Sequence, residues 1–208
     1  MKLIFFTLTL LFVCTSIYSQ NFLFNENQTG LNFTGRLSSY DQINVYGFNA
    51  GFTVNGKLTL GVDLEHRNGE IGDNAQSFSP YLNYLLVKQN NDTKPISINF
   101  HTFYKSQEHT FRDSNSKLFG LGLGIFKSYY LKNNITIIPG GNLKWSHGTL
   151  YISNEEYTAS DISYSLDLTA KYNNVYMTPR VLFISGMQIF EVDFGVVISG
   201  NNGKKKED

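Results

Sequence analysis

Residues 159–198 decide the fold, and they read ASDISYSLDLTAKYNNVYMTPRVLFISGMQIFEVDFGVVI. Apolar and polar residues alternate before and after Asn173-Asn174 and again after Ser185-Gly186, and both pairs are typical of tight β-hairpin turns. A period of two puts one set of side chains on each face of a sheet. The stretch therefore predicts three antiparallel strands of about ten residues, a length that suits a tilted strand crossing a bilayer.

The two turns also determine which residues face each other. A two-residue turn at Asn173-Asn174 places Asp167 opposite Arg180. A two-residue turn at Ser185-Gly186 likewise places Arg180 opposite Glu191. All three fall on the polar face, where an unpaired charge would be costly away from water. We interpret this row as an ion-pair network that fills a narrow lumen, in preference to a catalytic group.

The chain begins with a predicted targeting segment, residues 1–19. Its first residues are positive and its middle, residues 3–13, is apolar, while small and polar residues precede Gln20. The apolar part is too short for a membrane-spanning helix. The single cysteine, Cys14, lies within this segment and follows Val13, which does not fit a lipoprotein signal. We therefore predict neither lipidation nor thiol chemistry for the mature chain.

Composition favours a membrane barrel over a soluble or nucleic-acid-binding domain. The 17 basic residues equal the 17 acidic residues in number, so no basic field is available for nucleic acid. The 13 Tyr and 17 Phe residues raise the aromatic content to 15%. A barrel in a membrane places such residues outward, in two interfacial girdles. About 190 residues after the targeting segment make one domain with room for ten strands.

The rest of the chain repeats the alternation. Asn55-Gly56 is the strongest hairpin signal, and a three-residue loop there places Asp63 opposite Asn49. A turn at residues 132–134 places Lys144 opposite Gly122, where alternate glycines would give the lysine room. The predicted fold is all-β, a closed antiparallel transmembrane up-and-down β-barrel of ten strands, with eight as the alternative. Besides the ion-pair network, the polar residues expected to face the lumen are Arg36, Asp63, His101, Lys105, Lys144, Lys171 and Asp193.

Connections between the predicted strands alternate in length, which orients the barrel. Short connections at 55–56, 90–95, 132–134 and 173–174 alternate with longer polar ones at 68–77, 108–116 and 148–158. Two connections on the long side, near Asp41 and at Ser185-Gly186, are short, so the rule holds only in part. Short periplasmic turns and long outer loops are the rule for such barrels, so we expect both termini in the periplasm. The expected domains are a signal peptide at 1–19, a periplasmic N-terminal segment at 20–28, the barrel at 29–199 and a polar C-terminal tail at 200–208.

On these features the chain resembles the small outer-membrane barrel proteins of Bacteroidota and related Gram-negative bacteria, loosely of the OmpA, OmpX and OmpW type. The resemblance covers residues 29–199 and implies a porin-like barrel in the cell outer membrane. It also implies outer-membrane lipid and the insertion machinery as partners, and an unidentified protein or surface ligand at the outer loops. The polar tail departs from the family pattern, in which many members end in an aromatic residue. Pro139 and Pro179 also lie inside predicted strands, where each removes a hydrogen-bond donor, and a bulge would accommodate Pro139.

The polar side chains offer two candidates for catalysis or metal binding. Ser146 and His147, with Asp161, evoke the Ser/His chemistry of lipid-modifying barrels, but adjacent strand residues point to opposite faces of a sheet. His101 has no second His or Cys at a spacing useful for a metal. The sequence therefore predicts no catalytic residue, no metal and no cofactor.

The favoured function is a non-enzymatic structural, adhesive or assembly component with a side-chain-filled lumen. A narrow channel for small or amphipathic solutes is the first alternative, and a lipid-modifying enzyme is the second.

Overall fold

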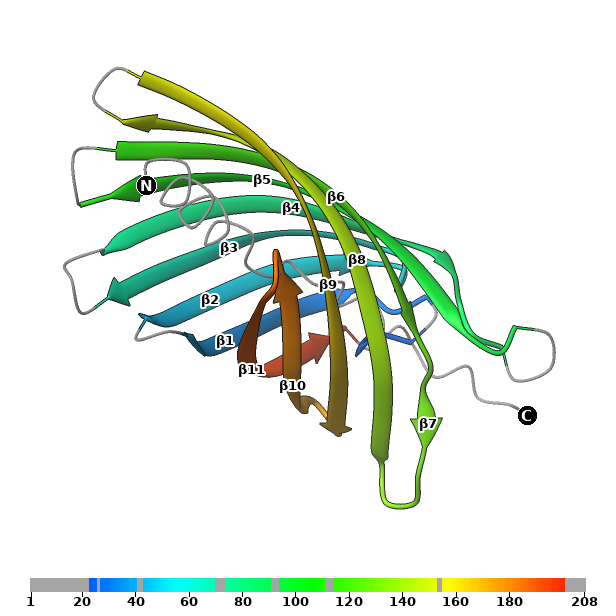
Figure 1. The fold of residues 1–208 in the computed structure, drawn as a ribbon. Coiled ribbons are helices and arrows are strands. Elements are labelled where there is room, and N and C mark those ends of the chain that lie inside the picture. The colour runs from blue at the N-terminus through cyan, green and yellow to red at the C-terminus, as the bar shows by residue number, and fades with distance from the viewer. Residues whose placement is uncertain are drawn as a thin grey trace, which may run out of the picture.

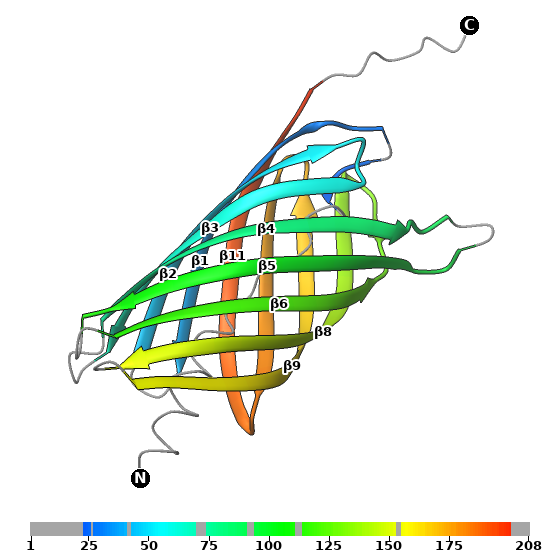
Figure 2. The same cartoon turned by 90° about the horizontal axis from the view of Figure 1, so that it is seen from above.

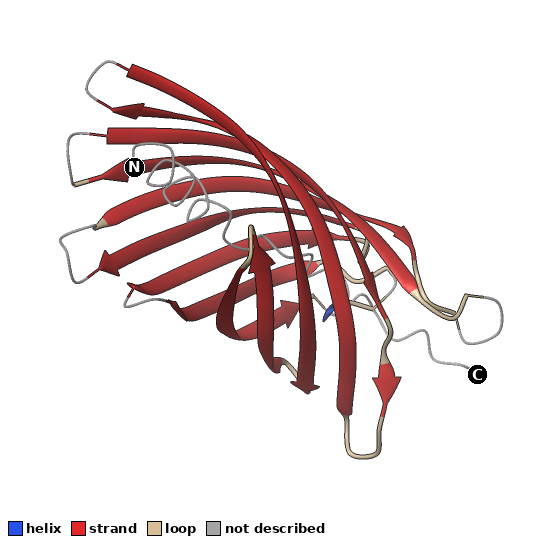
Figure 3. Ribbon diagram, viewed as in Figure 1, coloured by secondary structure: helices blue, strands red, loops and turns tan. Residues whose placement is uncertain are grey.

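The computed structural model describes residues 23–25, 27–40, 43–69, 74–90, 94–110, 114–152 and 155–200. The predicted signal peptide and residues 201–208 of the polar tail lie outside these ranges. Strands account for most of what is described (Figure 3). They are β1 Gly30–Tyr40, β2 Ile43–Val54, β3 Leu58–Gly69, β4 Ala75–Val87, β5 Ser97–His109, β6 Ser114–Phe126, β7 Tyr129–Tyr130, β8 Ile135–Ile152, β9 Glu155–Tyr172, β10 Val175–Ile184 and β11 Met187–Ser199.

The strands form one closed antiparallel barrel. Sheet neighbours follow the chain from β6 back to β1, then continue through β11, β10 and β9 to β8, and β6 pairs with β8 to close the ring (Figures 1 and 2). The short β7 pairs only with residues 136–137 of β8, outside the part of β8 that pairs with β6. The ten long strands confirm the predicted fold class. Within the described residues, no helix is both long and apolar enough to cross a membrane.

Turn chemistry sets the register as expected. Asn173 and Ser185 both adopt a positive φ, of 52° and 42°, and each starts a two-residue turn. The connection at Asn55-Gly56 has three residues, because Val54 pairs with Leu58. We call the end of the barrel that carries the connections at 55–57, 131–134 and 173–174 the turn end, and the opposite end the loop end.

The prolines do not disturb the register. Pro139 pairs with Leu168, and the pairs on both sides of it keep the same register, so the predicted bulge is wrong. Pro179 pairs with Val192 in an unbroken ladder to β11. The register shift in the barrel wall lies instead between Leu85 and Val87, in the strand whose sequence alternates least regularly.

Exterior side chains are apolar and interior ones are mainly polar at mid-height. Leu60, Leu123, Leu166 and Phe194 are each between 48% and 63% exposed, and their chain neighbours point inward. The described residues include 32 exposed large hydrophobic side chains. So many would be anomalous on a soluble domain, because large contiguous apolar patches are rare there. Lipid is the solvent that such a wall requires.

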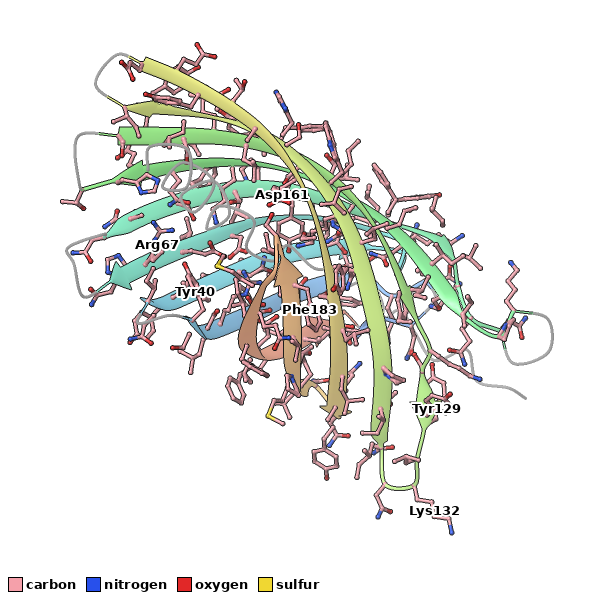
Figure 4. The ribbon with its side chains drawn as sticks, in the orientation of Figure 1. Tyr40, Arg67, Tyr129, Lys132, Asp161 and Phe183 are labelled. Atoms are coloured by element: carbon pink, nitrogen blue, oxygen red, sulfur yellow. The ribbon has the colours of Figure 1, made fainter. Side chains whose placement is uncertain are left out.

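The wall is uneven in height. β9 is paired on both sides from Ser163 to Tyr172, about the length of a tilted membrane-spanning strand. Beyond Ser163 it pairs with β8 alone, and these two strands extend past the tip of the shorter β10–β11 hairpin (Figure 1). In that region Asp161 accepts hydrogen bonds from the hydroxyl of Ser185 at the hairpin tip, at 2.9 and 3.0 Å (Figure 4).

Candidate functional site

Arg36 on β1 is the centre of a cluster of buried charges in the lumen. Its Nη1 lies 2.8 Å from Asp63 and 2.9 Å from Glu65, both on β3. On the opposite flank its Nε lies 3.0 Å from Asp193 and 3.3 Å from Glu191, both on β11. The Arg36 residue is only 4% exposed, so four carboxylates converge on one guanidinium that is almost out of contact with solvent. Its pairing with strands on both sides ties the first strand to the last.

Arg180 on β10 extends the cluster around the barrel. It pairs with Asp167 and Glu191 in the register that the turns predict. Its Nη1 donates to Glu191 and lies 3.1 Å from Asp193. The Asp167 carboxylate is farther away, 3.8 Å from the Arg180 Nε, and accepts a hydrogen bond from Asn142 at 3.1 Å. Asp167 is therefore the most weakly paired member of the predicted row.

Glu65 is the member that the predicted site omitted. It accepts hydrogen bonds from Arg36 and from Lys105 on β5, and so links the two cations. The signal was present in the sequence, since Glu65 has the same parity as Asp63, but parity alone does not say which inward acid meets which cation. We call the full set the charge belt: Arg36, Asp63, Glu65, Lys105, Asp167, Arg180, Glu191 and Asp193.

The other predicted lumen residues, His101, Lys144 and Lys171, also lie inside the wall but are not members of the charge belt. His101 is fully buried beside Gly122. The amine of Lys144 lies 5.9 Å from the centre of the Phe103 ring. Lys171 is partly buried near the turn end, where its amine donates to the backbone carbonyl of Leu23. Lys144 pairs with Gly122 in the register, as predicted. The space beside Gly120 and Gly122, however, is taken by the rings of Phe103 and His101 from β5.

Inward glycines receive large side chains from neighbouring strands. A Cβ atom added at Gly61 would overlap the ring of Tyr81, and one added at Gly195 would overlap the ring of Tyr176. Each tyrosine hydroxyl then reaches over one intervening strand: Tyr81 donates to Asn49 of β2 at 2.9 Å, and Tyr176 bonds with Thr34 of β1. Glycine here provides space for rings that fill the interior.

Apolar side chains close the lumen above and below the charge belt. Along β11 the inward residues are Ile189, then Glu191 and Asp193 of the belt, then Gly195 and Val197. At the loop end Ile189 belongs to a buried cluster, the loop-end cluster, made of Tyr40, Val45, Tyr81, Phe103, Leu118, Leu182, Ile184 and Ile189. At the turn end two smaller clusters occur, one of Leu23, Phe24, Tyr176 and Val197 and one of Leu85, Phe126 and Ile138.

The N-terminal segment takes part in this closure. Leu23 and Phe24 are 1% and 2% exposed, and Phe24 approaches Gly30 at the start of β1. The amide of Gly56 donates to the Gln28 carbonyl, which ties the segment to the β2–β3 turn. The described part of the predicted periplasmic segment is therefore packed into the turn end of the barrel.

The catalytic candidates do not form a triad. Ser146 is buried and faces inward, whereas His147 is outside, where it stacks on Trp145 and contacts Ser160 at 2.9 Å. Asp161 pairs with Ser146 in the register but binds Ser185. In the described ranges, no group of three or more His, Cys, Asp or Glu side chains is arranged to hold a metal ion.

Comparisons with known proteins give structural likenesses only. No protein-family model matches the sequence, and no curated protein matches it. Among solved structures, the chain is similar to the KdgM porin, with 12% identity over 79% of this chain and 98% of that chain and a TM-score of 0.42. It is also similar to Neisserial surface protein A, with 12% identity over 82% and 95% of the two chains and a TM-score of 0.37. The attachment invasion locus protein Ail of Yersinia pestis has 9% identity over 85% and 100%, with a TM-score of 0.39.

The class that the chain's own residues define is a closed ten-stranded β-barrel with an apolar exterior and a filled lumen.

Proposed function

We propose that this protein is an outer-membrane β-barrel with a sealed lumen, which acts as a non-enzymatic structural, adhesive or assembly component. The observation that carries the proposal is the charge belt enclosed between apolar clusters. An ion crossing the lumen would have to displace Arg36 or Arg180 from carboxylates within about 3 Å and also pass the loop-end cluster. Both steps are costly, because breaking a buried ion pair leaves an uncompensated charge.

The barrel's size agrees with this proposal. Eight strands enclose an interior that side chains just fill, and ten strands widen it only slightly. Here the additional space is taken by the rings of Tyr81, Phe103 and Tyr176. The projecting ends of β8 and β9 offer surface beyond the membrane-spanning part of the wall, which favours a role in contact with other molecules.

Conductance measurements test the sealed lumen. The purified barrel, reconstituted in planar bilayers, should show no steady porin-sized conductance, whereas a porin recorded in the same bilayers provides the positive control. The double variant Arg180→Ala/Glu191→Ala removes one cation and one anion from the belt together, and it should increase ion leakage. The outward Lys117→Ala variant should not. Steady conductance of the unmodified protein would contradict the proposal.

Steady conductance would instead support a narrow channel, and one observation favours this alternative. Neither ring nitrogen of the fully buried His101 forms a hydrogen bond within the described residues. Buried polar groups are almost always hydrogen-bonded, with water where protein offers no partner. A wetted lumen beside β5 is the starting point that a narrow aqueous path would need.

A further inference from the structure

A groove of about 700 Å³ crosses the apolar exterior near the turn end. One side is a row of outward residues that pair across successive strands: Ala170 with Met177, Met177 with Phe194, Phe194 with Gly35, and Gly35 with Phe48. The row is depressed at two places, because Gly35 has no side chain and Ala170 has only a methyl group. The groove therefore follows the hydrogen-bonding direction of the sheet.

The other side of the groove is the next outward row, two residues closer to the turn end. It runs from Tyr172 to Val175, then to Val196 and Phe33. At the far end the rings of Phe33 and Phe48 stack with their centroids 6.4 Å apart, and this stack closes the groove. The floor is the sheet itself, at the inward residues between the two rows.

The length and chemistry of the groove fit one kind of ligand. From Ile135 on β8 to Phe48 on β2 it spans six strands, about 24 Å at the usual spacing of neighbouring strands. Its walls are apolar side chains, and it opens onto the part of the wall that lipid covers. A long, thin, apolar ligand matches this shape. A volume of several hundred Å³ is in the range of specific small-ligand sites.

We propose that this groove holds one acyl chain of an inner-leaflet phospholipid. The inference rests on the proposed outer-membrane location, in which the turn end faces the periplasm. The chain enters beside Ile135 and Tyr172, which flank turns at that end, and lies toward the Phe33–Phe48 stack. Lys132, at the tip of the β7–β8 hairpin three residues before Ile135, offers a positive charge to a lipid phosphate (Figure 4).

A second copy of the chain fits the groove less well. In a two-fold symmetric contact the same surface meets itself, so the groove would lie against its own copy and both grooves would remain unfilled. A flexible acyl chain fills a narrow groove without such a restriction.

Gly35 provides a selective variant. A side chain added there meets nothing closer than the Phe194 carbonyl oxygen at 4.0 Å, so Gly35→Leu should fold normally while filling the groove. Gly141→Leu is the control outside the groove, because Gly141 also faces outward and does not line the groove. A Cβ added there would lie 3.2 Å from the Ser165 carbonyl oxygen, so the folding of this variant is checked by its unfolding transition. Ala170→Leu blocks the groove from a second position.

The experiment measures lipid association directly. Each variant is reconstituted in vesicles of phosphatidylethanolamine and phosphatidylglycerol that contain phosphatidylglycerol spin-labelled on its acyl chain, and motionally restricted lipid is measured by electron paramagnetic resonance. A leucine in the groove removes van der Waals contacts that the acyl chain makes there, so Gly35→Leu and Ala170→Leu should each weaken the tightest-bound lipid about threefold. Gly141→Leu should match the unmodified protein.

Equal lipid restriction in all four proteins would overturn the inference, as would cross-linking that shows a second copy over Gly35. Vesicle flotation separates this failure from that of the proposed location. A protein that does not float with vesicles contradicts the membrane barrel itself, whereas one that floats but shows no groove effect contradicts only the lipid site.

Discussion

Arg36→Met removes the central charge of the belt but keeps most of the aliphatic stem. The substitution leaves Asp63, Glu65, Glu191 and Asp193 facing one another without the guanidinium that lies within 3.3 Å of all of them. Truncating one partner of a buried ion pair typically costs about 3–5 kcal/mol. All four carboxylates lose a partner, and of the four Asp63 has no other ion pair within the described residues, whereas Arg180 still reaches Glu191 and Asp193 and Lys105 still reaches Glu65. We therefore expect a loss at the upper end of this range.

The assay is equilibrium unfolding in lipid vesicles, followed by the fluorescence of Trp145, the single tryptophan. Trp145 is outward and 42% exposed, so its emission reports whether the wall is in lipid. Lys117→Met is the control, since it removes a positive charge from the exterior of β6. The control should change the free energy of unfolding by about 0.5 kcal/mol or less.

The coupling between individual charges supplies a second test of the same contacts. A double-mutant cycle on Arg36 and Asp63, 2.8 Å apart, should give a coupling near the top of the usual range of about 0.5–3 kcal/mol. The same cycle on Arg180 and Asp167, 3.8 Å apart, should give less. If Arg36→Met were no more destabilising than Lys117→Met, the belt would not be a structural element of the barrel.

Two further predictions concern the wall and the glycines. Leu166→Arg lies in the part of β9 that is paired on both sides, and near the midplane it should lower the free energy of unfolding in vesicles by about 2–4 kcal/mol. Glu156→Arg, near the loop end, should be almost neutral. Equal effects of the two substitutions would contradict the lipid-facing assignment of Leu166. Gly61→Ala should destabilise the barrel by about 1–3 kcal/mol, because the added methyl group overlaps the ring of Tyr81, and the penalty should shrink in a Tyr81→Ala background. Thermal unfolding of the two single variants and the double variant measures this, and additive effects would count against the ring-and-glycine packing.

The barrel and its register could be predicted because they depend on local signals. Turn residues such as Asn173 fix the pairing of adjacent strands, and a period of two then assigns every side chain to one face. Arg180 could be placed between Asp167 and Glu191 on these grounds alone. Adjacent hairpins transmit such information well, since each turn constrains only the two strands that it joins.

What could not be predicted depends on contacts between distant strands. Arg36 meets Asp193 across 157 positions of sequence, and the pairing exists only because the barrel closes. Inward apolar residues are a second limit: Leu182 and Ile189 share the inward parity of the charges, and nothing in the local pattern shows that they pack together at one end of the lumen. The burial of Leu23 and Phe24 likewise depends on a space that only the assembled barrel provides.

The position of Arg36 has a consequence for how the barrel assembles. It binds acids on β3, which the chain delivers early, and acids on β11, which the chain delivers last. Before β1 pairs with β11, Arg36 lacks two of its four carboxylate partners, and Glu191 and Asp193 on β11 can pair only with Arg180. Bringing together Arg36 and Asp193, which are 157 positions apart, has a large entropic cost and is therefore slow. The charge belt is therefore complete only when β1 pairs with β11. A chain that lacks β11 would form an open sheet in which Arg36 binds only the acids of β3.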